Sequence, residues 1–201
     1  MNKTLQSAKY IAADFTASIL TWFIFFSYRK FYIELEKYGF NIPFEPDQNL
    51  FLGLVLIPVY WISLHTLSGS YFNIYRKSRL KELGQTLFIT LFGVIVLFFV
   101  LLLDDYIPSY KAYYKTFAFL FLLQFFITFL FRLILTSITQ HKIRSRKISF
   151  PTVIVGSNQN ALKLYNEFTS IKNSFGNQFI GFVHILEKYD HLLDKHVSHL
   201  G

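Results

Sequence analysis

The sequence predicts an α-helical membrane domain of four transmembrane helices, followed by a truncated Rossmann-like α/β unit with the order strand, helix, strand. Three observations support this fold class. The 201 residues are 53% hydrophobic and only 16% charged, whereas about a quarter of the residues in a soluble domain carry charge. Four long apolar segments alternate with clusters of charge, and a short β-branched run ending in glycine follows the last of them.

The first apolar segment predicts a membrane anchor. It covers about residues 10–28 and is closed by Arg29 and Lys30. A helical crossing needs about 20 mostly apolar residues, because every backbone N–H and C=O must be satisfied inside the segment. No small-residue cleavage site follows the apolar core. We therefore expect it to remain in the protein and not to be removed as a signal peptide.

Two further segments have the same character. The second span begins near Leu50 and carries no formal charge between Asp47 and Arg76. The third, residues 86–103, is uncharged and is bounded by charged residues on both sides. The third segment by itself predicts an integral membrane protein.

The fourth span, about residues 116–139, contains a single charge, Arg132. Arg132 and Asp14 are the only formal charges within the four spans. Counted from the predicted cytoplasmic ends of the first and fourth spans, at about 1.5 Å per residue, both charges lie at a comparable depth in the membrane. Because charge in hydrocarbon is costly, such groups either pair or snorkel to the interface. An intramembrane Asp14–Arg132 pair and separate snorkelling therefore both remain open, and neither residue is expected to be a catalyst.

Basic residues near the span ends predict that both termini lie in the cytoplasm, because such residues are retained on that side. In this arrangement ten basic residues flank the inner ends and five flank the outer ends. The inner set is Lys3, Lys9, Arg76, Lys77, Arg79, Lys81, Lys142, Arg144, Arg146 and Lys147; the outer set is Arg29, Lys30, Lys37, Lys111 and Lys115. The inner residues from 76 to 81 and from 142 to 147 are predicted to bind the membrane surface. The bilayer is thus the expected partner, and nucleic acid is not.

The composition changes after the fourth span. Residues 141–151 form a basic linker between a membrane domain, residues 1–140, and a cytoplasmic unit, residues 152–201. The run TVIVG at 152–156 predicts a buried parallel strand, SNQNALKLYNEFTSI at 157–171 a helix, and QFIGFV at 178–183 a second strand. Two strands and one helix bury too little surface to be stable alone. We therefore expect the chain to be the N-terminal part of a longer polypeptide.

The turn after the first strand is a degenerate dinucleotide fingerprint. The three glycine positions of G-x-G-x-x-G are occupied by Gly156, Asn158 and Ala161. Asn158 places a side chain where the pyrophosphate would approach. His184 and Ile185 stand where an acidic residue would bind the ribose. The three fingerprint residues are candidate cofactor-binding residues, and a structural fold without nucleotide is the preferred interpretation.

No metal site is predicted. The chain has no Cys, which excludes thiolate zinc sites and a Cys nucleophile. His191, His196 and His199 lie near Asp194 without the i, i+4 spacing of a helical zinc motif, so they are expected on a solvated surface. His65, in the second span, is expected to be a hydrogen-bonded packing residue.

The arrangement resembles a known family. Four spans, GSYFNIYRKSRLKELGQTL after the second, the basic linker, and VIVGSNQNALKLYNEF with NQFIGFV together resemble the N-terminal half of bacterial polyprenyl-phosphate glycosylphosphotransferases. The segment RKSRLKELGQTL is similar to Bacteroidetes-type undecaprenyl-phosphate sugar transferases. The resemblance covers essentially the whole chain and rests on the conjunction of these features.

The resemblance implies transfer of a sugar 1-phosphate from a nucleotide sugar to undecaprenyl phosphate, at the inner membrane of a bacterium, in exopolysaccharide or O-antigen biosynthesis. In that family the chemistry requires magnesium and an Asp-Glu pair in a C-terminal catalytic domain. No adjacent Asp-Glu pair follows the last span of this chain. We therefore expect an inactive membrane-anchoring and regulatory region without its own cofactor, with polyprenyl phosphate as implied partner and the α/β unit as a spacer, sensor or homo-oligomer surface.

Three other functions share some of these sequence features. A membrane-bound NAD-dependent nucleotide-sugar dehydratase also places four spans before a Rossmann domain, but it requires a sound fingerprint. A non-catalytic membrane interaction protein requires no further domain. A four-helix transporter is disfavoured because the spans show neither paired broken helices nor a polar site at mid-depth.

Overall fold

The computed structural model describes residues 3–33, 46–102, 110–170, 176–184 and 192–200. The elements in chain order are α1 (Lys3–Tyr28), η1 (Arg29–Ile33), α3 (Gln48–Leu67), η2 (Ile74–Arg76), α4 (Arg79–Leu97), η3 (Phe98–Leu102), α5 (Tyr110–Arg144), β1 (Phe150–Val155), α6 (Gln159–Ser170) and β2 (Asn177–Val183). Two compact units result, residues 2–137 and residues 138–201. The predicted fold class is confirmed: four long apolar helices precede a strand-helix-strand unit.

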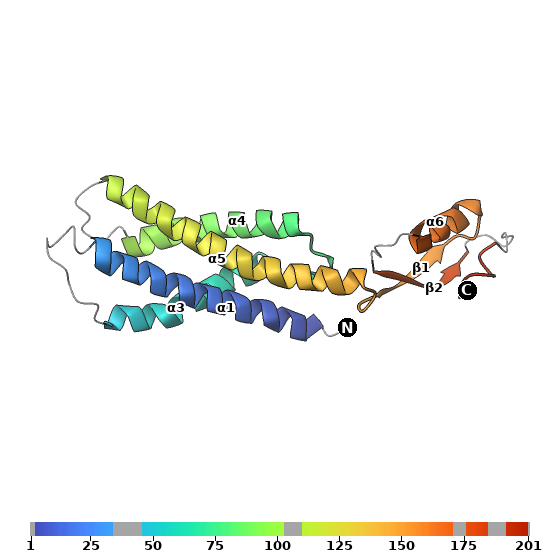
Figure 1. Ribbon diagram of the computed structural model, residues 1–201, viewed down its shortest axis with the longest axis horizontal. Helices are drawn as coiled ribbons and strands as arrows, with labels where there is room; N and C mark the ends of the chain where they lie inside the picture. The colour runs from blue at the N-terminus through green and yellow to red at the C-terminus, as the bar shows by residue number, and fades with distance from the viewer. Residues whose placement is uncertain (1–2, 34–45, 103–109, 171–175, 185–191, 201) are drawn as a thin grey trace. The chain divides into compact units, whose positions relative to one another are not determined.

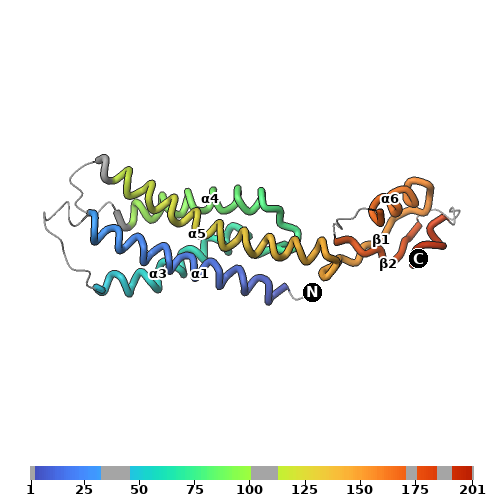
Figure 2. The backbone as a smooth tube through the Cα atoms, in the orientation of Figure 1, coloured from blue at the N-terminus to red at the C-terminus, as the bar shows by residue number. Residues whose placement is uncertain are grey.

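The four long helices form an antiparallel bundle (Figures 1 and 2). Each runs opposite to the one before it, so the start of α1 and the last third of α5 lie at the same end. There the Tyr10 and Thr136 hydroxyls share a hydrogen bond of 2.7 Å. At the other end, the rings of Tyr28 and Phe119 stack with centroids 4.2 Å apart. These contacts at the two ends show that α1 and α5 lie side by side.

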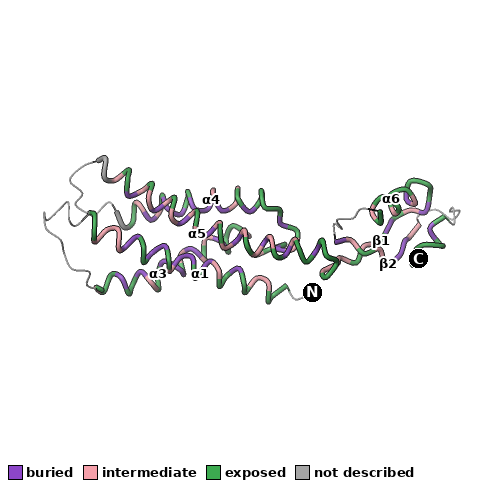
Figure 3. Tube along the Cα trace, in the orientation of Figure 1, coloured by how far each residue is buried: buried purple, intermediate pink, exposed green. Residues whose placement is uncertain are grey.

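All four helices are long and apolar enough to cross a membrane. The candidate spans are Lys3–Tyr32, Gln48–Leu67, Arg79–Val100 and Tyr113–Arg144. Exposed and buried positions alternate along each helix (Figure 3). The exposed ones include large apolar side chains such as Leu56, Phe88 and Phe126, which water would not tolerate in such density but lipid does. This is a multi-pass membrane protein by the length and composition of its helices.

Side-chain caps define where α3 and α4 begin. Asp47 Oδ1 accepts the Leu50 N–H at 3.0 Å, and Ser78 Oγ accepts the Lys81 N–H at 3.1 Å. Each oxygen satisfies a backbone donor that the first helical turn leaves without a partner. Burial raises the pKa of Asp47, but the Leu50 N–H and the Lys30 ammonium outweigh it, so this pKa lies below its ordinary value.

Two glycines allow the helices of the bundle to approach closely. A Cβ at Gly53 would overlap the indole of Trp22, which packs from α1 onto α3. A Cβ at Gly93 would lie 2.5 Å from the Trp61 ring, which packs from α3 onto α4. At the same place the Tyr60 hydroxyl donates to the Gly93 carbonyl at 2.8 Å. The tryptophans therefore sit in notches that only glycine provides.

The predicted linker at 141–151 is partly wrong, because α5 continues to Arg144 and β1 begins at Phe150. The basic residues of this stretch favour the helical C-terminus, whose dipole attracts cations. The helix then ends in a Schellman motif at Arg146, which has φ +58°. The Arg146 N–H donates to the Ile143 carbonyl and the Lys147 N–H to the Lys142 carbonyl, both at 3.0 Å.

The second unit contains a two-stranded parallel sheet, with β1 paired to β2 and an irregularity in register after Thr152. Its core is formed by Ile154, Ala161, Phe182 and Leu193. Residues 198–200 run along the outer edge of β2, where the Phe182 N–H donates to the carbonyl of residue 198 at 3.0 Å. The segment after β2 thus contributes to the sheet.

Candidate functional site: a buried charged cluster in the bundle

Asp14 and Arg132, the two charges predicted within the spans, are in direct contact. Arg132 Nε donates to Asp14 Oδ1 at 2.8 Å, and Arg132 Nη2 donates to Asp14 Oδ2 at 2.6 Å. Both side chains are almost completely buried. The guanidinium fork matches the carboxylate in a bidentate arrangement, the strongest geometry for such a pair. The pair joins α1 to α5 inside the bundle.

Two further charges extend this pair. Arg132 Nη1 donates to Glu82 Oε1 at 2.9 Å, and Lys77 Nζ lies 3.3 Å from Glu82 Oε2. We call Asp14, Lys77, Glu82 and Arg132 the charged cluster. Two positive and two negative groups alternate in it, so its net charge is zero. Neutrality and short contacts offset the large desolvation cost of burying four ions.

The connection between α3 and α4, residues 68–78, packs against the charged cluster and hydrogen-bonds to it. The Tyr71 hydroxyl donates to Asp14 Oδ2 at 2.7 Å, and Lys77 Nζ donates to the Ser70 carbonyl at 2.6 Å. Gly69 and Asn73 adopt positive φ, +70° and +50°, which lets the connection fold back against the helices. Burial and the nearby Asp14 carboxylate raise the pKa of Tyr71, so this hydroxyl stays protonated as a donor. Burial lowers the pKa of Lys77, and Glu82 opposes that shift.

Lys77 was predicted at the membrane surface, and this assignment is wrong because its ammonium is buried and binds Glu82. A run of basic residues does not reveal which member turns inward, and the fold of the connection decides it. The other predicted surface residues are exposed: Arg76, Arg79, Lys81, Lys142, Arg144, Arg146 and Lys147.

A column of buried polar side chains continues from the charged cluster into the bundle. It advances by three or four residues along each helix, so its members share the inward faces of α1, α4 and α5. The column comprises Ser18 and Thr21 of α1, Thr86 and Thr90 of α4, and Gln124 and Thr128 of α5. Beyond it the interior becomes apolar, with Phe25, Val94 and Leu120 buried. The expectation that the spans hold no polar site at mid-depth is therefore wrong, because Gln124 and Thr128 are buried near the middle of α5.

Several groups of this column have no hydrogen-bond partner among the described residues: the hydroxyls of Thr21, Thr86 and Thr90 and the Gln124 carbonyl oxygen. Threonine has a hydropathy close to zero, so these spans have the hydropathy of apolar helices. Only the packed bundle shows that the threonines of different helices face one another.

Removing the hydroxyl of a buried threonine should affect stability differently depending on whether that hydroxyl has a hydrogen-bond partner. Thr136→Val deprives the buried Tyr10 hydroxyl of its partner and is expected to lower the free energy of unfolding by about 1–3 kcal/mol. Thr90→Val removes a buried hydroxyl that has no partner among the described residues and is expected to leave the free energy of unfolding unchanged or to raise it by about 1 kcal/mol. Denaturant titration in detergent micelles measures both. Equal destabilisation would show that Thr90 also has a strong polar partner.

The three fingerprint residues gather at the start of α6. Gly156 has φ +110°, and its N–H donates to the Val183 carbonyl at 2.7 Å. Asn158 Oδ1 accepts the Ala161 N–H at 3.0 Å, and Ala161 is buried against the sheet. The Asn158 side chain thus occupies one of the backbone donors that a phosphate at this helix would need. The turn serves as a helix cap in this structure.

The cap can be tested within the full chain. Asn158→Ala removes the side-chain acceptor and is expected to weaken α6 by about 1 kcal/mol, whereas Asn158→Asp retains an acceptor and favours the helix dipole. Hydrogen exchange of the α6 amides reports the local effect. Identical exchange in the alanine and aspartate variants would contradict a capping role.

The histidines that the structure describes belong to the second unit, residues 138–201, with one exception. His199 Nε2 is 3.2 Å from His184 Nδ1, and the His196 ring packs on Tyr165; His191 lies outside the described residues. Within the described part of the chain, no three His, Asp or Glu side chains gather where they could hold a metal. The exception is His65, which is buried between Trp61 and Tyr71, with no described partner for Nδ1.

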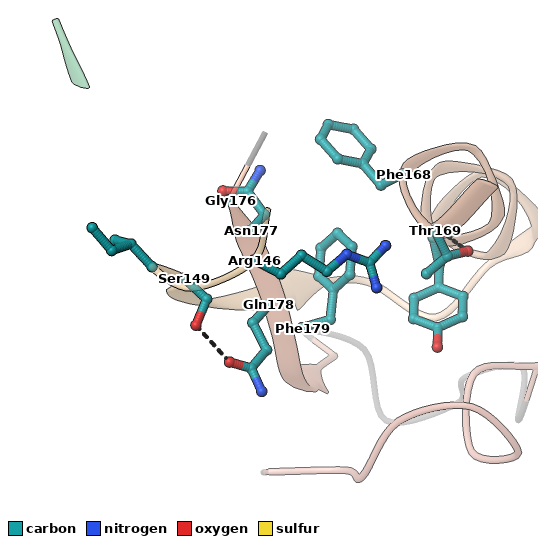
Figure 4. A pocket seen from close by; sticks show the side chains of 10 residues that line it. Arg146, Ser149, Phe168, Thr169, Gly176, Asn177, Gln178 and Phe179 are labelled. Carbon is teal, nitrogen blue, oxygen red and sulfur yellow. Dashed lines mark hydrogen bonds between the residues drawn. The ribbon is translucent and has the colours of Figure 1, made fainter. Parts of the chain in front are cut away.

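A pocket of about 300 Å³ lies in the second unit, at the ends where β1 and β2 begin (Figure 4). The Arg146 side chain extends toward Thr169 and Phe179, and Ser149 Oγ donates to Gln178 Oε1 at 2.8 Å. Nucleotides bind open α/β sheets outside the carboxyl ends of the strands. This pocket lies at the amino ends of the strands, so it does not correspond to a dinucleotide site.

Sequence reasoning missed two members of the site, Tyr71 and Glu82, and assigned Lys77 to the membrane surface instead. Glu82 lies four residues before the third apolar run. Its position along the third helix places it at the same level in the bundle as Arg132, with which it pairs, and counting residues from the span ends could have indicated this. Tyr71 and Lys77 belong to a connection whose path no periodicity predicts. Comparisons with protein-family models, curated proteins and solved structures find no match for this chain.

Proposed function

We propose that this chain is the membrane-anchoring and regulatory region of an enzyme that transfers a sugar 1-phosphate from a nucleotide sugar to undecaprenyl phosphate. The observation that carries the proposal is the course of α5, which passes from an apolar span through a basic last turn and leads directly into a parallel strand-helix-strand unit. A membrane bundle joined in this way to an α/β unit suits an enzyme that meets a lipid substrate and a soluble nucleotide sugar at one membrane surface.

The bundle would place that surface on the cytoplasmic side of a bacterial inner membrane. Seven exposed basic residues lie at the span ends near the charged cluster, either between α3 and the first turn of α4 or in the last turn of α5 and just after it. Basic flanks of this kind are retained in the cytoplasm. They attract anionic headgroups, including a polyprenyl phosphate. The charged cluster joins α1, α4, α5 and the connection after α3 at this end.

The second unit offers a place for a catalytic region to pack. Val153 and Val155 of β1 and Leu164 of α6 are 39%, 65% and 44% exposed. They line a groove of about 490 Å³ beside β1. Within the described residues β1 pairs only with β2. We propose that the region carrying the magnesium site and the acidic catalytic residues covers this groove, and that the present chain contributes no catalytic group.

The experiment compares membranes of the native host with and without this gene. Formation of polyprenyl-diphosphate sugar and release of nucleoside monophosphate are followed with a panel of radiolabelled nucleotide sugars. We expect both to be lost on deletion, restored by the native gene, and absent with the purified 201-residue chain alone. Leu164→Lys should reduce transfer in membranes by blocking the groove, whereas Lys163→Gln on the exposed face of the same helix should not.

Other results would overturn the proposal. Unchanged transfer after deletion excludes a role in this reaction. A keto sugar formed with NAD would instead indicate a nucleotide-sugar dehydratase, against which the side chain of Asn158 at the fingerprint already counts. Loss of a partner protein from the membrane, without loss of transfer, would indicate a non-catalytic interaction protein.

A further inference from the structure

A second feature of the bundle lies at the end opposite the charged cluster. A groove of about 490 Å³ opens there between α1, α3 and the end of α4. Trp22 and Leu97 in its lining are buried, whereas Leu52, Leu56 and Val100 are 50%, 61% and 64% exposed. The groove is thus an apolar furrow that opens toward the surroundings of the bundle, which for a membrane protein is lipid.

The packing of the helices explains the groove. Where the Tyr60 hydroxyl donates to the Gly93 carbonyl, α3 and α4 are in close contact. Toward the far end the groove lies between them, and the Trp22 indole fills the space between α1 and α3 by packing on Gly53. Along α3 the lining extends from Asn49 to Tyr60, a length of about 16 Å at 1.5 Å per residue.

Two basic side chains line the polar end of the groove. Arg29 and Lys30 line it together with Asp47, and Lys30 Nζ lies 3.3 Å from Asp47 Oδ2. Two of these three described lining groups are cations. Arg29 presents a planar set of N–H donors that suits phosphate oxygens. These residues stand where the apolar spans end, at the level of lipid headgroups.

We propose that this groove binds an anionic glycerophospholipid, with one acyl chain along α3 and the phosphodiester at Arg29 and Lys30. An apolar furrow in a bilayer does not stay empty, because its lining would lose dispersion contacts, and water gains no hydrogen bonds there. An acyl chain is long and flexible enough to fill it. The positive mouth selects an anionic headgroup over a zwitterionic one, whose extra cation would meet Arg29 and Lys30.

The test uses the full chain in phosphatidylcholine nanodiscs that contain a trace of phosphatidylglycerol with a photoactivatable acyl chain. Crosslinked peptides are identified by mass spectrometry. We expect crosslinks on the α3 peptide that contains Leu52 and Leu56. The variant R29Q/K30Q should reduce them by about tenfold, since each basic residue near anionic lipid contributes roughly fivefold and Asp47 offsets part of the pair.

Two further variants separate the groove from general charge and from misfolding. K3Q/K9Q removes the same charge from two exposed lysines at the other end of α1 and should leave crosslinking unchanged. L56W fills the groove from an exposed position while all charges remain, and should abolish crosslinking even if R29Q/K30Q fails to fold. Equal labelling by photoactivatable phosphatidylcholine, or undiminished labelling of L56W, would overturn the proposal. No readout depends on sugar transfer, so the two proposals succeed or fail separately.

Discussion

Replacing Arg132 by methionine is expected to destabilise the bundle more than any other single substitution considered. Arg132 donates to both Asp14 and Glu82, and all three side chains are buried. Removal of the shared cation leaves two buried carboxylates without adequate compensation, and breaking a buried ion pair in this way costs about 3–5 kcal/mol. Denaturant titration in micelles and the amount of folded protein in membranes measure the loss.

An arginine elsewhere on the same helix provides the control. Arg144 is exposed near the end of α5, and Arg144→Met is expected to change the free energy of unfolding by less than about 0.5 kcal/mol. Similar losses for both substitutions would show that methionine, and not the loss of the buried cation, is responsible.

An exchange of charges tests the pairing itself. D14R/R132D restores opposite charges across α1 and α5 but places a carboxylate beside Glu82. We therefore expect the double variant to be more stable than the worse single variant and less stable than the parent. Adding E82Q should recover part of the remaining difference, because it removes the new repulsion. A double variant no better than either single variant would contradict a stabilising Asp14–Arg132 pair.

Gly53→Ala is expected to lower the free energy of unfolding by about 1–3 kcal/mol. The added methyl group would overlap the Trp22 indole, and this ring cannot swing away without breaking the hydrogen bond of 3.1 Å from its Nε1 to the Leu50 carbonyl. The gain in helix propensity, about 1 kcal/mol at most, is smaller than the cost of separating α1 from α3. Thermal unfolding of the purified chain in micelles measures the difference.

Gly84 is the matched control, because a Cβ built there meets no atom within 4 Å. Gly84→Ala should therefore raise the free energy of unfolding by up to about 1 kcal/mol through propensity alone. Opposite signs for the two substitutions are expected. A stabilising Gly53→Ala would mean that α1 and α3 are not held at the separation that the Trp22 notch requires.

Much of the fold could be predicted because its determinants are local. An apolar run long enough to span a bilayer must become a helix, since no other conformation of a single segment satisfies its own backbone in lipid. The alternation of a β-branched run, an amphipathic stretch and a second β-branched run likewise indicates strand, helix, strand. Helix ends were harder to predict, and α5 extends into the expected linker because basic residues favour a helix C-terminus.

The sequence by itself therefore determined the four helices, the strand-helix-strand unit, and the isolation of Asp14 and Arg132 within apolar spans. Only the tertiary structure decided that these two residues meet, that Glu82 and Tyr71 join them, and that Lys77 turns inward from an otherwise exposed basic run. It also decided that scattered threonines form one polar column. The reason is physical: periodicity assigns a residue to a face of its own helix, whereas partners across a bundle are set by helix rotation, depth and the path of the connections.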